Sequence, residues 1–552
     1  MGTPVIKNDV LHLKIEDMSI DGEGIGKVEG YTLFVKDAII GDEIEAKVIK
    51  AKKNYGYARL MKVLKPSSYR TEPICPIARQ CGGCQLQALS YEKQLEFKQN
   101  KIKHNLESIG KCKDFELLPI IGMEHPFAYR NKAQYPVRYD KEGNIVMGFF
   151  AGRTHDVIET KKCYLGVEEN EAVLEAVKLY MLENKVTAYD EKAHKGLVRH
   201  ILIRKGFSSG QLMVCLIING NSLPAKEKLI EKLVQIEGMT SISFNINREK
   251  GNTILGRECI TIYGQSTIVD SIQGVSFDIS PQSFFQVNPI QTQILYSNAL
   301  RFAGLTGTET VWDLYCGIGT ISLFLARQAF QVYGIEIIPQ AIDNARNNAN
   351  RNGIDNVEFF VGKAEEILPN YYEKEKLAGR NTKADVIVVD PPRKGCAPEL
   401  LDTIVKIEPE RVVYVSCDSA TLARDVRYME ERGYELVKVQ GVDMFPNTTH
   451  VETVVLLSKL RPDDYVEVDL ELDELDLTSA EKKATYQKIK DYVLDKYGVK
   501  VHTRYIAEVK RMCGIEMGEN YNKSKKEEPE VKHCPQEKVE YIVDALRYYL
   551  MI

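Results

Sequence analysis

The chain has 552 residues with 73 basic and 78 acidic side chains, so its formal net charge is −5. This balance excludes a wholly basic nucleic-acid binder but leaves room for a local basic patch. No apolar run approaches the ~18–20 residues that span a bilayer, and the N-terminus lacks the apolar core of a signal peptide. We therefore expect a cytoplasmic, multidomain globular protein whose 12 cysteines do not form a disulfide framework.

Residues 1–65 are the first predicted domain. Short strand-like pieces alternate with Gly- and Asp-rich turns, which is typical of a small OB-like β-barrel. The stretch 46–65 holds Tyr55 and Tyr57 and contains no acid, and its basic side chains are Lys47, Lys50, Lys52, Lys53, Arg59, Lys62 and Lys65. Such a stretch suits RNA, because cations follow phosphates and aromatic rings stack on bases. It equally suits a solvated sheet edge guarded by lysines.

Residues 66–275 are predicted to form a central α+β domain, with a helical segment over 91–115 that can pack on the next domain. Cys75, Cys81 and Cys84 lie close together around Gly82 and Gly83, and Cys163 is a candidate fourth thiolate. Four thiolates suit either a zinc ion or an iron–sulfur cluster, and the spacing alone does not separate the two.

Residues 276–460 alternate between helix and strand, which indicates a doubly wound, Rossmann-like sheet. The run Asp313-x-x-x-Gly317-x-Gly319 joins a strand to a helix, and a third dinucleotide-type glycine is missing because Ser322 stands there. This form resembles motif I of class I S-adenosylmethionine methyltransferases. Glu336 ends the next strand, where a carboxylate can accept ribose hydroxyls.

Two further predicted strands end at the same edge. Asp390 closes the strand before Pro391, and Cys417 follows the strand 411–416 at the start of a helix. A thiol at a helix N-terminus is expected to have a lowered pKa, and its thiolate is a nucleophile. Cys316 and Cys396 also lie near this edge, but the first sits inside the glycine turn and the second in a loop. Cys417 is therefore the favoured nucleophile.

The next predicted strand begins at Met444 and includes His450 and Glu452. Either side chain can serve as a general base, and Glu452 is preferred over His450. A thiolate and a base together suit methylation of a pyrimidine at carbon 5. Addition of the thiolate to carbon 6 makes carbon 5 nucleophilic, and the base later removes the carbon 5 proton.

Three stretches carry a family resemblance: Ser416-Cys417 to Asp425, Asp443-Met-Phe-Pro446 to Glu452, and Phe285-Gln286-Val-Asn288. They resemble the RNA (uracil-C5)-methyltransferases, and the 23S rRNA branch in particular, over residues 8–460. The resemblance implies Cys417 as nucleophile, Glu452 as base and a TRAM-type RNA-binding barrel at the N-terminus. Asp418-Ser419 and Asn447 depart from the commonest family pattern.

The resemblance also implies the cofactors. Residues expected to contact S-adenosylmethionine are Gln286, Asp313, Tyr315, Gly317, Gly319, Glu336 and Asp390. A [4Fe-4S] cluster is implied at Cys75, Cys81, Cys84 and Cys163.

The expected activity is methylation of a uridine in 23S rRNA by a monomeric enzyme that does not engage membranes. Two alternatives stay open, a tRNA uracil-5-methyltransferase and a non-catalytic RNA-binding or assembly protein. Residues 461–552 are expected to be a C-terminal helical extension without an assigned role. They begin with an acidic run, in which eight of the residues Asp463 to Asp476 are acidic.

Overall fold

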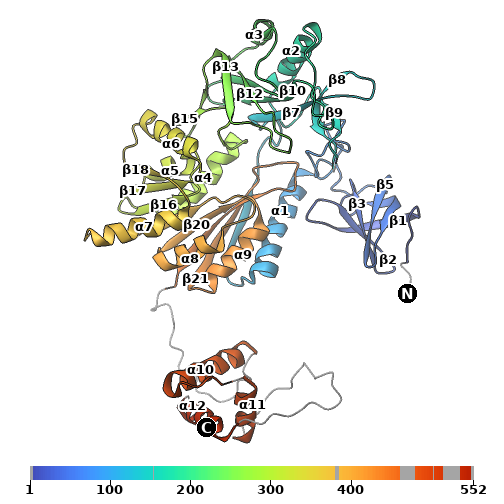
Figure 1. Cartoon of the computed structure of the whole chain (residues 1–552). Helices are drawn as coiled ribbons and strands as arrows, with labels where there is room; N and C mark the ends of the chain where they lie inside the picture. The colour runs from blue at the N-terminus through green and yellow to red at the C-terminus, as the bar shows by residue number, and fades with distance from the viewer. Residues whose placement is uncertain are drawn as a thin grey trace. The chain divides into compact units, whose positions relative to one another are not determined.

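The computed structural model describes residues 4–152, 154–379, 384–460, 479–501, 503–513 and 535–548. The chain separates into two compact units, Met1–Pro462 and Asp463–Ile552 (Figure 1). The acidic run Asp463–Asp476 lies outside the described residues. None of the helices in the described ranges has both the length and the apolar character needed to cross a bilayer.

The N-terminal strands close into a barrel in the order β1-β2-β3-β5-β4, with β1 paired to both β2 and β4. The strands are β1 (Val10–Met18), β2 (Gly24–Val28), β3 (Tyr31–Lys36), β4 (Glu43–Ala51) and β5 (Tyr55–Lys65). Alternate residues point inward, so that Leu33, Val35 and Ile44 are fully buried. The predicted five-stranded barrel is confirmed.

A seven-stranded sheet forms the central region, in the order β13-β12-β11-β10-β7-β8-β9. Its strands are β7 (Lys132–Tyr139), β8 (Ile145–Phe150), β9 (Val157–Glu159), β10 (Val198–Lys205), β11 (Leu212–Ile218), β12 (Met239–Ile246) and β13 (Glu258–Gly264). Helices α2 (Glu169–Glu183) and α3 (Lys226–Leu233) pack against it, and a hairpin of β14 (Ile268–Ile272) and β15 (Val275–Ile279) follows.

An eight-stranded sheet forms the third part of this unit, in the order β18-β17-β16-β19-β20-β22-β21-β6. Its strands are β6 (Glu116–Ile121), β16 (Thr310–Leu314), β17 (Gln331–Glu336), β18 (Val357–Val361), β19 (Val386–Val389), β20 (Arg411–Ser416), β21 (Tyr434–Val442) and β22 (Glu452–Lys459). The strands from β18 to β20 are parallel, and β22 runs antiparallel to β20. This is the predicted Rossmann-like arrangement, and the carboxyl ends of its parallel strands meet at one edge.

Helices cover both faces of this sheet (Figure 1). They are α1 (Tyr91–Asn105), α4 (Pro289–Ala303), α5 (Thr320–Ala326), α6 (Pro339–Arg351), α7 (Ala364–Leu377), α8 (Pro398–Ile407) and α9 (Ser419–Glu430). Two large clusters of buried side chains, one on each face, share the strands between them. Trp312 is fully buried in the second of these clusters.

The helical segment 91–115 and the strand after it belong to this sheet rather than to the central one. Helix α1 ends at Asn105, a π-helical turn covers Leu106–Gly110, and β6 pairs in parallel with β21. Gln440 joins the two strands further, because its side chain donates to the Pro119 carbonyl at 2.7 Å. The pairing partner of β6 lies more than 300 residues away along the chain, so local pattern alone did not reveal this placement.

The strand that carries Glu452 starts later than the sequence predicted. Residues 443–451 have no strand structure, and β22 begins at Glu452 itself. Pro446 has no backbone N–H to donate, and Asn447 has a left-handed φ of 68°. These two residues bend the chain into a loop, which we call the base loop (residues 443–451).

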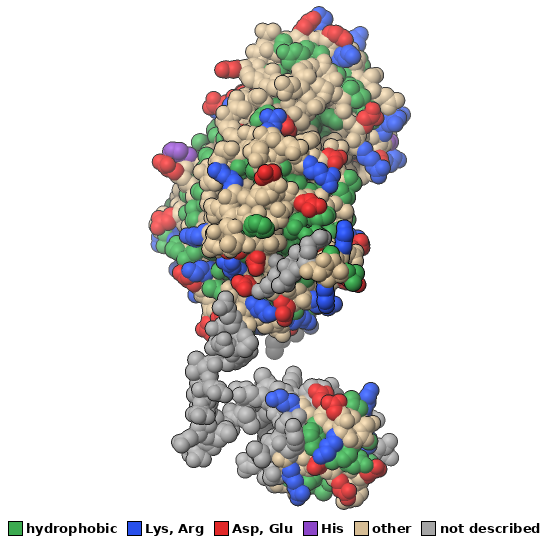
Figure 2. Space-filling model, turned by 90° about the vertical axis from the view of Figure 1, so that its left-hand side faces the viewer, with side chains coloured by type: hydrophobic (Ala, Val, Ile, Leu, Met, Phe, Trp, Pro, Cys, Tyr) green, Lys and Arg blue, Asp and Glu red, His purple; other side chains and the backbone are tan. Residues whose placement is uncertain are grey.

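The C-terminal unit contains α10 (Ser479–Tyr497), α11 (Thr503–Met512) and α12 (Gln536–Tyr548). The three helices share an apolar cluster of their own, which includes Ile489, Val493, Ile506 and Ile542. On the face seen in Figure 2, basic and acidic side chains are interspersed over both units.

Candidate functional site

A cavity of about 1190 Å³ opens at the carboxyl edge of the eight-stranded sheet. Almost all of the predicted catalytic and cofactor residues line it: Gln286, Asp313, Tyr315, Gly317, Glu336, Asp390, Cys417 and Glu452. His450, Cys316 and Cys396 line it as well. Gly319 is the one predicted cofactor residue outside this lining, so the fold brings the candidate groups into a single cleft.

The glycine turn between β16 and α5 has an unusual backbone. Tyr315, Gly317 and Gly319 all have positive φ, at 73°, 56° and 81°. A Cβ at Gly319 would approach the Phe359 ring and Ala345 at 3.0 and 3.2 Å. Gly319 therefore permits close packing beneath the turn, whereas Gly317 faces the cleft itself.

Two carboxyl groups, of the buried Asp313 and the half-buried Asp390, line the cleft. Burial raises the pKa of Asp313 to about 7, although Ser322 donates to its Oδ2 at 2.5 Å. Burial and the nearby charge of Asp313 raise the pKa of Asp390 to about 7 as well. The other oxygen of Asp313, Oδ1, is buried and has no hydrogen-bond partner among the described residues. This environment is suited to a ligand that brings positive charge or hydrogen-bond donors.

Cys417 lies directly after β20, next to Glu452. Ser416 pairs with Thr453 across β20 and β22, so the following residue on one strand lies beside the preceding residue on the other. Asp418 caps α9 by accepting from the backbone N–H groups of Ala420 and Thr421 at 2.9 and 3.2 Å. The thiol is thus held at the junction of a central strand and a capped helix.

The expectation of a lowered pKa for Cys417 is wrong for this cleft without a ligand. Burial is the largest effect, and the charges of Glu452 and Asp390 add to it, so the pKa rises to about 11. Arg393 acts in the opposite direction. The helix N-terminus does not outweigh burial next to two carboxyl groups.

The two candidate bases have opposite electrostatic environments. Glu452 is almost fully buried, and burial together with Asp390 raises its pKa to about 8. Burial lowers the pKa of His450, and nearby cations, of which Arg393 contributes most, add to this effect, so that the pKa is about 4. His450 is therefore neutral at pH 7, whereas Glu452 titrates close to that pH.

Arg393 has an influence that the sequence analysis missed. It follows Asp390-Pro391-Pro392, lines the cleft and lowers the pKa values of both Cys417 and Glu452. Arg393 comes directly after the Asp-Pro-Pro turn at the carboxyl end of a parallel strand, and this place in the sequence could have predicted that it lines the cleft.

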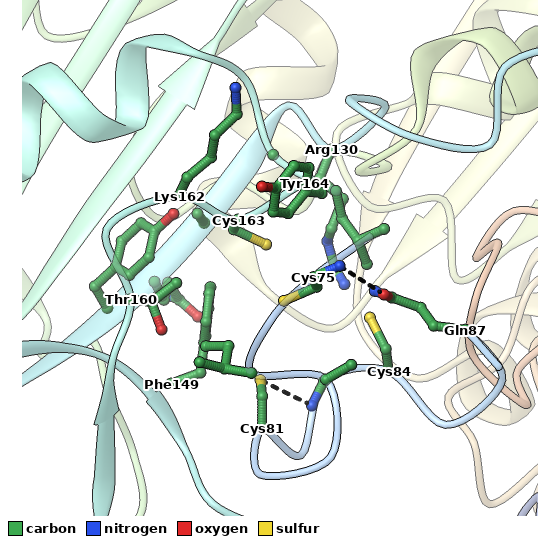
Figure 3. A pocket seen from close by; sticks show the side chains of 18 of the residues that line it. Cys75, Cys81, Cys84, Gln87, Arg130, Phe149, Thr160, Lys162, Cys163 and Tyr164 are labelled. Carbon is green, nitrogen blue, oxygen red and sulfur yellow. Dashed lines mark hydrogen bonds between the residues drawn. The ribbon is translucent and has the colours of Figure 1, made fainter. Parts of the chain in front are cut away.

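A second cavity, of about 310 Å³, is lined by Cys75, Cys81, Cys84 and Cys163. Figure 3 shows the four side chains around one pocket, where Gly83 N–H donates to the Cys81 sulfur at 3.4 Å. Burial, with a smaller contribution from the neighbouring cysteines, raises the pKa values of Cys75, Cys81 and Cys84, the last to about 12. In the described part of the chain, no three His, Cys, Asp or Glu side chains are arranged to hold a metal ion.

The barrel carries an aromatic group beside a lysine. The ring centroids of Phe34, Tyr55 and Tyr57 lie 5.7–5.8 Å apart. The Lys52 Nζ lies 4.8 Å from the Tyr55 centroid and donates to the Tyr55 hydroxyl at 2.8 Å. Both tyrosines are half-buried, so part of each ring faces solvent.

Comparison with known proteins identifies relatives over most of the chain. Residues 90–460 match the family described as tRNA (Uracil-5-)-methyltransferase, and residues 4–61 match the TRAM domain. An uncharacterized RNA methyltransferase of Clostridium tetani is 48% identical over 456 residues, which cover 82% of this chain and 97% of that protein. A similar protein of Halalkalibacterium halodurans is 49% identical, over 82% of this chain and 98% of its own length.

A solved structure is similar as well. The Pyrococcus abyssi tRNA (uracil-54, C5)-methyltransferase, in complex with S-adenosyl-L-homocysteine, has a TM-score of 0.64 and 27% identity. The match covers 81% of this chain and 100% of the Pyrococcus chain. The chain therefore belongs to the tRNA (uracil-5-)-methyltransferase family, and it is an S-adenosylmethionine-dependent RNA uracil-C5 methyltransferase with an N-terminal TRAM domain.

Proposed function

We propose that this enzyme methylates carbon 5 of a uridine in 23S rRNA, with Cys417 as nucleophile and Glu452 as proton-abstracting base. The observation that carries this proposal is the meeting of both side chains in one cleft with the buried Asp313 and the half-buried Asp390. A thiol and a carboxyl on adjacent strand ends are the two groups that this reaction requires.

The reaction proceeds in balanced steps. The Cys417 thiolate forms a bond to carbon 6 of the uracil, and the ring becomes an enolate that is nucleophilic at carbon 5. Carbon 5 would take the methyl group that S-adenosylmethionine supplies when bound, and the broken sulfur–methyl bond would leave S-adenosylhomocysteine. Glu452 then removes the carbon 5 proton, the carbon 5–carbon 6 double bond re-forms, and the carbon–sulfur bond breaks to release Cys417.

The electrostatics of the cleft support this order of events. Cys417 and Glu452 are held mostly protonated at neutral pH by burial and by Asp390. A cationic sulfonium in the cleft would favour the thiolate of Cys417 and the carboxylate of Glu452, because a nearby positive charge lowers the pKa of an acid. We propose that Gln286, Asp313, Tyr315, Gly317, Glu336 and Asp390 contact the methyl donor, with Gly319 supporting the turn from below.

A covalent trap tests the two catalytic roles. RNA with 5-fluorouridine has no removable proton at carbon 5, so the methylated adduct cannot resolve. Wild-type enzyme should form a denaturation-resistant complex, Cys417→Ala none, and Glu452→Gln should accumulate an adduct on ordinary uridine RNA. Equal trapping by wild type and Cys417→Ala would overturn the mechanism. Folded wild-type protein that binds RNA without trapping it would favour a non-catalytic RNA-binding role.

We further propose that Cys75, Cys81, Cys84 and Cys163 hold a [4Fe-4S] cluster. All four line one pocket and are half-buried, and four thiolates are a standard cluster ligand set. A single zinc ion would require the sulfurs to converge at about 2.3 Å from one point. The four side chains surround a cavity instead, which favours a larger group.

The cluster has a direct spectroscopic test. Anaerobically purified protein should be brown, with absorbance near roughly 400 nm and about four irons per chain. Cys81→Ser should lose this absorbance, whereas Cys513→Ser, in the C-terminal unit, should retain it. Colourless protein that contains zinc would refute the assignment.

The barrel is the proposed first RNA contact. We assign residues 1–65 to RNA binding, 66–275 to the cluster domain, 276–460 to methyl transfer and 461–552 to an extension. Lys52 beside Tyr55 and Tyr57 offers a cation and ring faces to single-stranded RNA.

The choice of rRNA over tRNA rests on the resemblance to the 23S branch, through the barrel and the cysteine set together. The tRNA alternative is favoured by the Pyrococcus structure, whose protein acts on uracil 54 of tRNA. Mapping 5-methyluridine in the rRNA and tRNA of a deletion strain separates them. Loss from 23S rRNA alone is expected, and loss from tRNA alone would refute the rRNA assignment.

A further inference from the structure

We propose that helix α1 is a positioning element, whose buried and half-buried polar stripe holds the nucleophile and the base in place relative to each other. The stripe consists of Tyr91, Gln94, Lys98, Lys101 and Asn105, spaced three and four residues apart and therefore on one face. Apolar residues normally occupy a face with this spacing. The inference rests on the proposed catalytic roles of Cys417 and Glu452.

The middle of the stripe holds the start of the base loop. Lys98 is fully buried, and its Nζ lies 2.5 Å from Asp443 Oδ1 and 3.0 Å from the Phe445 carbonyl. Tyr91 donates its hydroxyl to the other oxygen of Asp443 at 3.0 Å. Both oxygens of one buried carboxylate are thus bound by side chains of α1.

Two more side chains of α1 hold the rest of this loop. Gln94 accepts from the Asn447 backbone N–H at 2.9 Å and donates to the Asn447 side chain at 3.3 Å. Lys101 donates to the Thr449 carbonyl at 3.0 Å. The anchored segment therefore runs from Asp443 to Thr449 and ends three residues before Glu452.

The last residue of the stripe reaches the nucleophile. Asn105 donates its side-chain N–H to the Ser419 hydroxyl at 2.8 Å, and both side chains are buried. Ser419 is the first residue of α9 and stands two positions after Cys417. One rigid helix thus touches the segments that carry both proposed catalytic groups.

Directional contacts explain why this face is polar. A well-packed apolar seam would stabilise the fold as well as a buried ion pair or better, because charges lose hydration on burial. A hydrogen bond, however, specifies distance and direction. The base loop has no strand or helix of its own, so it requires such external contacts to hold Glu452 in place. Misplacement by about 1 Å can slow a reaction by roughly 100-fold.

The test uses one variant at each end of the set of contacts and a matched control. Asn105→Ala removes the hydrogen bond to Ser419 near the nucleophile, and Lys101→Met removes the hydrogen bond to the base loop at Thr449. Lys103→Met removes the same charge from the exposed face of α1, where Lys103 pairs with Glu107 at 3.8 Å. Each variant is assayed as the full chain, with Trp312 fluorescence reporting on folding.

The two variants should slow different steps of the reaction. Asn105→Ala should slow adduct formation on 5-fluorouridine RNA by about 10- to 100-fold, with an unchanged KM for S-adenosylmethionine. Lys101→Met should form the adduct at nearly the normal rate but should accumulate methylated adduct on ordinary uridine RNA, because proton removal slows. Lys103→Met should match wild type in both assays.

Several results would overturn the proposal. One is a proportional fall in both steps that follows the folded fraction, which is what a purely structural role produces. Another is Lys101→Met raising the KM for RNA and changing its salt dependence without adduct accumulation, since this marks a direct phosphate contact. Indistinguishable behaviour of both variants and Lys103→Met would also overturn it. If wild type itself fails to trap RNA, the proposed function falls instead.

Discussion

At the scale of single residues, the cleft is controlled by a few charges in a buried environment. Asp390 raises the pKa values of Cys417 and Glu452, and Arg393 lowers both. Together with burial, these charges keep the pKa of Glu452 at about 8, close to neutral pH. A general base is most effective when its pKa lies near the working pH.

This balance predicts the pH dependence of the reaction. Glu452 must be ionised to accept a proton, and its pKa is raised, so the rate at which the methylated adduct resolves in a single turnover should increase with pH through a midpoint near 8. Arg393→Gln removes a cation that lowers this pKa and should therefore move the midpoint upward. Lys394→Gln, next to it in the cleft lining, serves as the control. An unmoved midpoint in Arg393→Gln would assign the titration to another group.

At the scale of elements, helix α1 illustrates how a single helix can connect distant segments. Its fully buried ion pair joins Lys98 to Asp443, which lies 345 residues further along the chain. Removing one partner of such a pair leaves an uncompensated buried charge.

We expect Lys98→Met to lower the free energy of unfolding by about 3–5 kcal/mol. The double variant Lys98→Met with Asp443→Leu should recover most of this loss, because neither charge then remains buried. The fluorescence of Trp312, the single tryptophan, reports selectively on denaturant unfolding of the eight-stranded sheet. The exposed Lys103→Met should change stability by less than about 0.5 kcal/mol. Equal stability of wild type and Lys98→Met would show that the pair contributes nothing.

The barrel makes a separate prediction about RNA affinity. Replacing Tyr55 and Tyr57 by alanine should weaken binding by about 1–3 kcal/mol for each stacked base. Lys52→Gln should reduce the slope of log affinity against log salt by roughly 0.7, because one phosphate contact is lost. Lys14→Gln, an exposed lysine on β1, should leave affinity unchanged. Filter binding over a salt series measures both effects, and wild-type affinity in the tyrosine variants would exclude stacking there.

At the scale of the whole molecule, the chain comprises a large unit with the cleft and a small helical unit. The family matches cover residues 4–61 and 90–460, and neither reaches the helices α10 to α12. Those helices bury a separate apolar cluster. Methyl transfer therefore depends on the larger unit.

A chain that ends at Pro462 should therefore keep its activity. Its kcat should remain within about twofold of the full chain, and the Trp312 unfolding transition should be unchanged, because the helical unit has its own core. Single-turnover methylation and denaturant unfolding provide the measurements. A large loss of adduct formation in a folded, shortened protein would assign the helical unit a part in RNA binding.

Much of the site was predictable because its parts are local strand-to-loop motifs. Asp313, Asp390 and Cys417 each follow or end a buried parallel strand, and the carboxyl ends of such strands meet at one edge. The start of β22 was predicted eight residues too early, because the apolar pattern around Met444 resembles a strand. The effects of Pro446 and Asn447 on that segment depend on contacts with α1 and with the 85–86 backbone.

The sequence by itself determined the barrel, the doubly wound sheet and the identity of the residues in the cleft, because hydrophobic periodicity and short motifs act over a few neighbouring residues. Only the tertiary structure decided that β6 pairs with β21 in the eight-stranded sheet, whereas the packing of the helical segment 91–115 on this domain was already expected. It also decided that Cys417 has a raised pKa and that a polar stripe of α1 contacts the segments before Glu452 and after Cys417. These features depend on groups hundreds of residues apart, and their burial and charge interactions exist only when the chain is folded.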